Sequence, residues 1–300
     1  MAHPPEAQCY EIPEYCETRE KRTRMGIGHQ CHFFRRLAMN PAALVALDRY
    51  PLMKLDTASG SRFAAKLTAQ YRADGLCHLP QFLKLGALTA LQEEARKLQG
   101  KAYFVRGTHT VYLEKGGDHK NGNPAKAPEQ TEVGSVAYDL LPEHGLLRTL
   151  YEWEPLKELI RRVLDKPRLH YFADPLGACS INVFRAGGKH GWHFDESEFT
   201  TTLMLQSPEC GGAFEYVPQI RGLPEEQNLV SRILGGEREG VCRLPFTEGS
   251  LLIFGGRQTL HRVTEISGSV SRLVPVLCYT EQPNETNSDA VRQYFWGRTT

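Results

Sequence analysis

The chain has 300 residues, of which 41% are hydrophobic and 24% are charged, as is usual for globular proteins. Its 36 basic and 35 acidic side chains give a net charge of +1, which gives no reason to expect a nucleic acid or an anionic membrane as partner, so we expect a small molecule. No stretch approaches the roughly 20 apolar residues of a membrane span, and the start "MAHPPEAQCYEIPEYCE" lacks the segments of a signal peptide, so we expect a cytoplasmic protein.

Residues 1–55 mix proline, tyrosine and charged residues, and they carry the basic run "REKRTR" that is typical of a solvated arm. We expect an N-terminal arm here, either a lid or an interface, ahead of one domain over 56–300. The arm contains "HQCH" at 29–32, but no second ligand pair follows at a spacing that zinc sites use. The eight cysteines include no Cys-x-x-Cys pair, so we expect buried or idle thiols.

Three segments before residue 168 have the apolar spacing of helices. The first is "SRFAAKLTAQY" at 61–71, which ends before the turn "ADG"; "LCHLPQFL" then indicates a strand running into a loop. The second, "LGALTALQEEARKLQG" at 85–100, places its leucines on one side and ends at a glycine. The third, "EPLKELIRRVLDKP" at 154–167, ends at a proline.

After Pro167 the chain consists of short runs rich in Val, Leu, Phe and Thr, punctuated by Gly, Pro or Ser. They are "RLHYFADP", "CSINVFRAGG", "FTTTLMLQS", "GGAFEYVPQ", "VCRLPFTEGSLLIFGG", "QTLHRVTEISG" and "SRLVPVLCYTEQ". Strands at this spacing indicate a β-sandwich or a closed double sheet of jelly-roll type. We therefore expect an α+β protein with a double-stranded β-helix core, a cupin-like jelly roll, flanked by N-terminal helices. No linker separates the two parts, so we expect one domain.

The stretch "GGKHGWHFDES" at 187–197 contains His193 and Asp195. Residues two apart on a strand project from the same face, so this imidazole and this carboxylate can bind one ion. Such a pair arises easily by chance. Two further features must agree before it predicts a metal site.

The first feature is a third ligand. His261 lies in "GSLLIFGGRQTLHRVTEI", where a buried strand meets a Gly-Gly turn and the next strand delivers the histidine. Two histidines and one carboxylate form the facial triad of iron(II) oxygenases. The second is Arg272 in "SRLVPVLCY", an isolated charge in a hydrophobic strand, which is costly unless it meets an anion. The alternative, that the two histidines are ordinary strand residues and Arg272 lies on the surface, needs three coincidences in the right order.

In this order the features resemble the Fe(II)/2-oxoglutarate-dependent dioxygenases, whose pattern is His-x-Asp, a distal His, and an Arg about ten residues later. The likeness extends over roughly residues 60–300 and includes "YRADGLCHLPQFL" followed by a long helix.

The resemblance implies that His193, Asp195 and His261 bind Fe(II), and that 2-oxoglutarate and O2 are cosubstrates. Arg272 is then expected to bind the far carboxylate of 2-oxoglutarate. Asn182, in the run "INVF", is expected to donate a hydrogen bond to the cosubstrate, or alternatively to make only a strand-end hydrogen bond.

Within this superfamily the chain is most similar to the group acting on free amino acids, which contains lysine-type halogenases and related hydroxylases. The similar residues are "NVFRAGGKHGWHFDESEFTTTLMLQ", "GGAFEYVPQIRG", "GRQTLHRVTEISGSVSRLVPVLCY" and Trp296. Halogenases of this kind have a small residue in place of the carboxylate ligand, so that chloride can occupy the iron. Asp195 fills that position here, so the resemblance implies hydroxylation rather than chlorination. Desaturation or ring closure stays open.

The same resemblance implies substrate contacts. His190 is expected to meet the substrate carboxylate and Glu196 an amino group, while Trp296 would cover the substrate. Arg106, in "YFVRGTHTVYL", is a candidate for a second carboxylate contact, and Asp174, in "FADP", for an amine contact. Each has a plain alternative: His190 at an exposed turn, Glu196 in solvent, Trp296 as a packing residue, and Arg106 and Asp174 without a role.

Val276 and Cys278 are apolar where lysine-type enzymes carry polar groups, which favours a less polar amino acid. The expected reaction is hydroxylation of an unactivated C–H bond in a free amino acid or a small derivative, with release of succinate and CO2. Two other classes stay open: a non-catalytic jelly-roll protein with a structural or regulatory metal, and a zinc hydrolase. Arg272 argues against both, because neither needs a buried anion-binding group.

Overall fold

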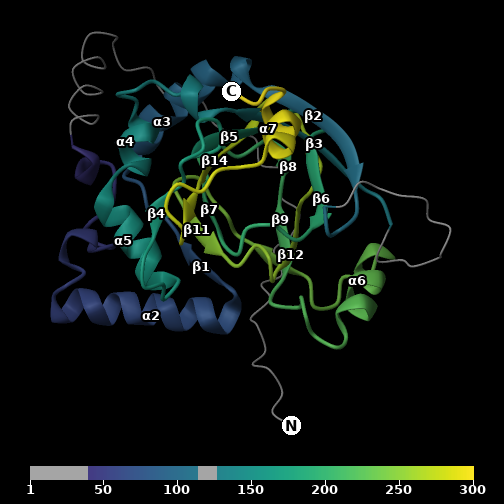
Figure 1. Cartoon of the computed structure of the whole chain (residues 1–300), viewed down its shortest axis with the longest axis horizontal. Coiled ribbons are helices and arrows are strands. Elements are labelled where there is room, and N and C mark those ends of the chain that lie inside the picture. The colour runs from purple at the N-terminus through teal and green to yellow at the C-terminus, as the bar shows by residue number, and fades with distance from the viewer. Residues whose placement is uncertain (1–39, 114–126) are drawn as a thin grey trace.

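The computed structural model describes residues 40–113 and 127–300, and its centre is a curled antiparallel β-sheet (Figure 1). In these residues eleven strands share one sheet. In order across the sheet they are β1 (Leu76–Leu79), β11 (Leu251–Phe254), β7 (Thr200–Leu203), β14 (Arg272–Leu277), β5 (Cys179–Phe184), β3 (Glu129–Val136), β6 (Lys189–His193), β12 (Leu260–Val263), β9 (Phe214–Val217) and β10 (Cys242–Leu244), with β2 (Tyr103–His109) beside β3. Two small sheets pair β4 (His170–Tyr171) with β15 (Tyr279–Thr280), and β8 (Cys210–Gly211) with β13 (Ile266–Ser267).

Helices cover one side of this sheet, at the left of Figure 1. They are α2 (Ala58–Asp74), α3 (Leu85–Leu98), α4 (Leu146–Tyr151) and α5 (Glu154–Val163). Helix α6 (Glu226–Leu234) lies at the opposite side, and α7 (Asp289–Trp296) lies near the top. Short 3-10 turns are Pro41–Ala43, Leu52–Lys54, Gln99–Lys101 and Tyr138–Leu140.

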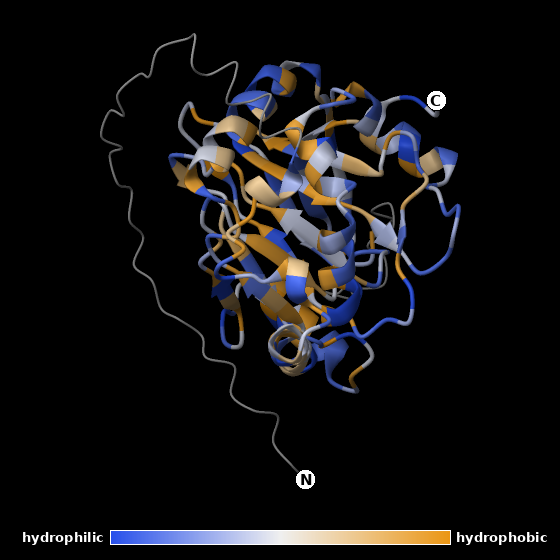
Figure 2. Ribbon diagram, turned by 90° about the vertical axis from the view of Figure 1, so that its left-hand side faces the viewer, coloured by the Kyte–Doolittle hydropathy of each residue, from blue (hydrophilic) through white to orange (hydrophobic). Residues whose placement is uncertain are grey.

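The predicted helices form because their ends are capped and one face is apolar. Thr57 caps α2 by accepting a hydrogen bond from the Gly60 N–H, and Gly75, at φ +69°, ends it in the left-handed conformation. Helix α3 buries Leu88 and Leu91 against the sheet, as its spacing predicts. The hydropathy colouring of Figure 2 shows apolar strands inside the molecule.

The predicted strands after Pro167 are confirmed by β4, β5, β7, β9, β10, β11, β12, β14 and β15. The β core does not lie wholly after Pro167, because β2 and β3 come before α4 and pair within the central sheet. Strand order in a sheet is set by long-range pairing, which local composition does not report. Of the segment predicted as an arm, residues 40–55 are described, and Leu44, Val45 and Leu52 are buried in the core beneath the helices.

Alternate residues of each strand face the inside of the curled sheet. On β14, Leu273 is buried in the core under the helices, whereas Val274 packs with Phe214 and Phe254 on the inside. Arg272 and Val276 lie on the same side as Val274, because side chains two apart on a strand share a face. The half-buried residues of the inner face are Asn182, His190, Thr200, Thr202, Tyr216, Val276 and Cys278.

A bulge in β6 turns two histidines to this inner face. β12 residues His261 and Val263 pair with His193 and His190, so three steps along β6 match two along β12. His190 and His193 would lie on opposite faces of a regular strand. The extra residue restores both to the inside, while Trp192 packs in a separate apolar cluster.

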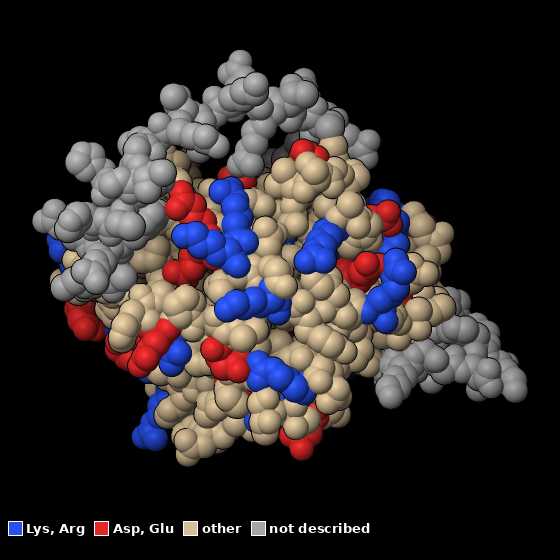
Figure 3. Space-filling model, turned by 90° about the horizontal axis from the view of Figure 1, so that it is seen from above, with Lys and Arg blue, Asp and Glu red and all other residues tan. Residues whose placement is uncertain are grey.

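Some features of the described residues bear on the remaining expectations. Cys77, Cys179 and Cys278 are free thiols, but Cys210 is disulfide-bonded, so the expectation of thiols throughout is wrong there. No helix in residues 40–113 and 127–300 is long and apolar enough to cross a membrane. The face in Figure 3 carries basic and acidic side chains interspersed with one another. The "HQCH" and "REKRTR" segments lie outside the described residues.

Candidate metal centre and active site

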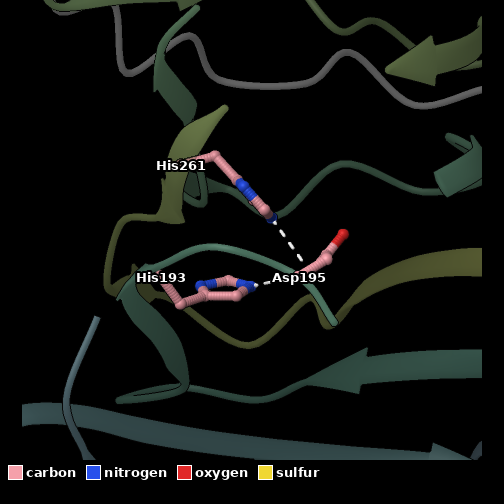
Figure 4. Close-up of side chains that lie close together, drawn as sticks. All are labelled: His193, Asp195 and His261. Carbon is pink, nitrogen blue, oxygen red and sulfur yellow. Dashed lines mark ion pairs between the residues drawn. The ribbon is translucent and has the colours of Figure 1, made fainter. Parts of the chain in front are cut away.

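His193, Asp195 and His261 converge at one point on the inner face (Figure 4). His193 ends β6, its pairing partner His261 lies beside it on β12, and Asp195 follows in the loop after β6. Their candidate ligand atoms all lie within 4.8 Å of one another. The Oδ1 atom of Asp195 is 3.3 Å from Nε2 of His193 and 3.5 Å from Nε2 of His261. Atoms that share one ion at bonds of about 2.1 Å lie at such separations, so the donor set fits a metal.

The two imidazole rings are held in the tautomer that metal binding needs. Nδ1 of His193 donates to the carbonyl of Gly191 at 2.7 Å, and Nδ1 of His261 donates to the carbonyl of Thr259 at 2.8 Å. Because a carbonyl oxygen only accepts, each Nδ1 carries the proton and each Nε2 presents a lone pair. Hydrogen bonds of this kind fix the orientation of metal-binding histidines.

The carboxylate of Asp195 is held from the opposite side. The Thr200 hydroxyl donates to its Oδ2 at 2.6 Å, which leaves Oδ1 toward the two histidines. Its backbone N–H donates to the carbonyl of Gly256 at 3.0 Å. A Cβ atom at Gly256 would lie 2.2 Å from Oδ2, so only glycine allows this close approach. The Gly-Gly turn of the sequence therefore makes room for Asp195.

Burial and mutual charge set the protonation of His193 and Asp195. Burial, and then His261, lower the pKa of His193 to about 4. Burial alone would raise the pKa of Asp195, but the two histidines outweigh it and hold that pKa well below its usual value. His193 is thus a neutral imidazole and Asp195 an ionised carboxylate at neutral pH, which are the forms that bind metals.

Arg272 is a buried cation without an anion. Its side chain is 2% exposed, and burial lowers its pKa to about 9. Its guanidinium carbon lies 5.3 Å from the centre of the Phe184 ring. Within residues 40–113 and 127–300 it makes no ion pair, and its Nε atom has no hydrogen-bond partner. A bidentate donor left in this state is suited to a carboxylate ligand.

Asn182 lies near Arg272 on the same face of the sheet. It pairs with Val274 across β5 and β14, two residues along from Arg272. Its Oδ1 atom accepts a hydrogen bond from the Ser135 hydroxyl at 3.2 Å. The amide nitrogen makes no hydrogen bond within the described chain, so it can donate to a ligand.

His190 joins the triad, and Glu196 does not. The His190 ring stacks on His193 with centroids 3.7 Å apart, and it lies on β6 rather than at an exposed turn. Burial, and then the charge of His193, lower the pKa of His190 well below its usual value. The Glu196 side chain is exposed, and its backbone carbonyl accepts hydrogen bonds from Arg257.

Arg106 and Trp296 also lie away from the triad. Arg106 pairs with Glu132 across β2 and β3, on the face opposite to the inner one; its side chain is 83% exposed and forms an ion pair of 2.6 Å with Glu132. Trp296 packs with Ala137 and Leu176 in a small apolar cluster beside α7. A strand residue one position from an inner residue faces outward, which is why Arg106 does not reach the site.

Asp174 is buried with all its acceptor capacity in use. It accepts hydrogen bonds from the N–H groups of Leu176, Gly177 and Asn287, and from Nε of Arg292 at 2.8 Å. Burial raises its pKa, but these hydrogen bonds outweigh burial and the pKa falls below its usual value. The carboxylate therefore fixes the C-terminal segment and has no free lone pair aimed at a substrate amine.

Four residues of the site were not predicted: His109, Thr131, Thr200 and Gly256. Thr200 and Gly256 hold and admit the Asp195 carboxylate. His109 is 5% exposed, and its ring centroid lies 6.1 Å from that of His193. Apart from the Gly-Gly turn, nothing in the local sequence marks these residues, because their partners are brought close only by strand pairing.

Comparisons with known proteins are consistent with this geometry. A family model described as halogenase D matches residues 60–294, and a search of curated sequences finds no match. SnoN, a non-heme alpha-ketoglutarate-dependent epimerase from nogalamycin biosynthesis, is 20% identical over 73% of this chain and 83% of its own, with a TM-score of 0.52. The structure of SnoN in complex with Fe3+, alpha-ketoglutarate and nogalamycin RO is 19% identical over 73% of this chain and 84% of its own, with a TM-score of 0.51. SnoK, a non-heme alpha-ketoglutarate-dependent carbocyclase from the same biosynthesis, is 17% identical over 71% of this chain and 82% of its own, with a TM-score of 0.50. At these identities the solved structures establish the fold.

Proposed function

The chain belongs to the halogenase D family within the Fe(II)/2-oxoglutarate-dependent oxygenases, and from this premise we propose that it hydroxylates a free amino acid or a small amino-acid derivative. The reaction inserts oxygen into an unactivated C–H bond and releases succinate and CO2. The observation that carries the proposal is the convergence of His193, Asp195 and His261 on one point, with a buried unpaired arginine on the same inner face.

In this proposal His193, Asp195 and His261 hold Fe(II) through two Nε2 atoms and one carboxylate oxygen. The bound iron supplies O2 activation coupled to oxidative decarboxylation of 2-oxoglutarate. The protein fixes the tautomer and orientation of both imidazoles through their carbonyl partners and keeps the carboxylate oriented through Thr200. These contacts direct the three donor atoms toward one point.

Arg272 is proposed to bind the far carboxylate of 2-oxoglutarate, and Asn182 to donate to the same cosubstrate. A dianion on this face would give the buried guanidinium the counter-charge that the described residues do not supply. Two parallel N–H···O bonds would also fix the direction of the cosubstrate. Phe184 and Val274 beside these residues limit the entry of water.

Oxygenation rather than halogenation is proposed because Asp195 takes the third ligand position. A halide ligand would need that place on the metal. Here the carboxylate is fixed by Thr200, and the absence of a side chain at Gly256 makes room for it. Oxygenation of the substrate is therefore the expected outcome, with desaturation or ring closure as its alternatives.

The substrate is proposed to bind beside His190, with its carboxylate on that imidazole. His190 stacks on a metal-binding residue, so a group that it holds lies next to the metal. Val276, Cys278 and Thr202 provide a weakly polar, half-buried surface on the same face, which suits an uncharged substrate side chain. Glu196, Arg106, Asp174 and Trp296 have other surroundings, as described above, and no substrate contact is assigned to them.

The experiment is succinate formation from 2-oxoglutarate with Fe(II), ascorbate and pools of amino acids, with mass spectrometry of the products. A gain of one oxygen atom supports hydroxylation, loss of two hydrogens indicates desaturation or ring closure, and a gain of chlorine contradicts the outcome proposed for Asp195. His261→Ala is expected to lose iron binding and succinate formation, whereas His144→Ala, at an exposed histidine, should lose neither. Full activity of His261→Ala would refute the metal assignment. Iron-loaded protein that turns over no amino acid would refute the substrate class.

A further inference from the structure

The backbone that orients His193 is itself held by side chains of β3. Gly191, whose carbonyl accepts from Nδ1 of His193, donates its N–H to the Thr131 hydroxyl at 3.2 Å. The next N–H in the bulge, that of Trp192, donates to Oε2 of Glu129 at 2.9 Å. A Cβ atom at Gly191 would lie 2.7 Å from Cβ of Glu129, so the bulge is packed directly against β3.

Thr131 continues into a buried histidine that the proposed function does not use. Nε2 of His109 lies 2.6 Å from the Thr131 hydroxyl, and Nδ1 of His109 lies 2.9 Å from the carbonyl of Thr110. Since a carbonyl only accepts, Nδ1 of His109 carries the proton, and Nε2 of the neutral ring accepts from Thr131. The threonine oxygen is then free to accept from the Gly191 N–H. Each donor and acceptor therefore has a consistent direction.

We propose that His109 and Thr131 are positioning residues that set the orientation and metal affinity of His193. The inference rests on the proposed function, because it concerns the same metal centre. Thr131 fixes Gly191, Gly191 fixes the Nδ1–H of His193, and Nε2 thereby faces Asp195. Hydrogen-bonded partners behind a metal-binding histidine commonly change metal affinity by about 10- to 100-fold.

His109 matters because it gives the Thr131 hydroxyl a single direction. Both side chains are buried, at 5% and 2% exposure, so water does not readily replace either partner. The His109 ring also contacts two rings of the site edge to face: its centroid lies 5.9 Å from that of His190 and 6.1 Å from that of His193. The last residue of β2 thus supports the metal site through β3 and the bulge of β6.

The test measures Co(II) binding to the full chain by calorimetry without O2, together with thermal unfolding and the visible absorption of the bound Co(II). Thr131→Val keeps the shape but removes the hydroxyl, and we expect Co(II) affinity to fall by about 10- to 100-fold with altered absorption bands. Thr131→Ser keeps the hydroxyl and should restore both. Thr201→Val is the matched control, because Thr201 is equally buried, faces the helices, and its hydroxyl has no partner among the described residues.

Native affinity and native spectrum in folded Thr131→Val would overturn the inference. Should that variant not fold, His109→Gln, which can still accept from Thr131, is compared with His109→Phe, which cannot. Weaker binding by the phenylalanine variant alone supports the relay, and equal affinities refute it. His193→Ala in the same titration separates the two levels: unchanged Co(II) binding there would refute the metal site, whereas loss there with native binding in Thr131→Val refutes only the relay.

Discussion

Replacing Arg272 with methionine should stabilise the ligand-free protein while weakening 2-oxoglutarate binding. Arg272 is 2% exposed, and burial lowers the pKa of its guanidinium from the usual arginine value to about 9. At about 1.4 kcal/mol for each pKa unit, that difference corresponds to about 5 kcal/mol spent on keeping the charge buried. The contact with Phe184 returns about 1 kcal/mol. Methionine keeps apolar volume without charge, so we expect a gain of about 1 to 4 kcal/mol in unfolding free energy.

The pH dependence has a definite sign. Because the folded pKa of Arg272 lies below the unfolded value, the folded protein binds fewer protons between about pH 9 and the usual arginine pKa. The destabilisation is therefore fully present below pH 9 and decreases as the pH rises through that range. The stability advantage of Arg272→Met should shrink in the same range, which denaturant unfolding at pH 7 and pH 10 can measure.

Binding of 2-oxoglutarate should respond in the opposite direction. Loss of a buried charge pair of this kind costs about 2 to 5 kcal/mol, or about 30-fold to several thousand-fold in affinity. Calorimetry with Co(II)-loaded protein measures the affinity for 2-oxoglutarate. Arg272→Lys keeps the charge without the bidentate geometry, so its affinity should lie between those of the native protein and Arg272→Met. The reasoning fails if ligand-free Arg272→Met is less stable than the native chain, or if it binds 2-oxoglutarate as tightly.

Two other changes test the surroundings of the site. Gly256→Ala places a Cβ atom 2.2 Å from Oδ2 of Asp195, so Fe(II) affinity should fall at least about 10-fold. Gly100→Ala is the control, because a Cβ atom there has nothing within 4 Å, and it should leave Fe(II) affinity unchanged. Equal affinities of the two variants would contradict the steric argument. Asp174→Asn removes the buried carboxylate that pairs with Arg292, which keeps only a longer ion pair with Asp289, and it should lower the unfolding free energy by about 3 kcal/mol. Because the folded pKa of Asp174 is depressed, the contribution of its carboxylate to stability is present above pH 3.8 and is lost as the pH falls through the folded pKa. Denaturant unfolding should therefore show the unfolding free energies of the two proteins converging in acid. A difference that stays constant with pH would contradict this.

The sequence by itself determined the elements and the chemistry that depend on local pattern. The helix at 85–100 and most strands after Pro167 follow from apolar periodicity, and they form where that periodicity predicts. The triad and Arg272 were recognisable because their residue types are costly or reactive in strand-like surroundings. Burial of His193, His261 and Arg272 at 4% exposure or less agrees with that argument.

Only the tertiary structure decided which other polar residues meet the triad. A strand alternates its faces at every residue, so one extra residue in β6 brings His190 beside His193, while Arg106 faces outward on a regular strand. Asp174 looked available in the sequence, yet folding saturates it with partners such as Asn287, far along the chain. Local pattern reports what a side chain is, whereas register and long-range pairing decide where it points and what already binds it.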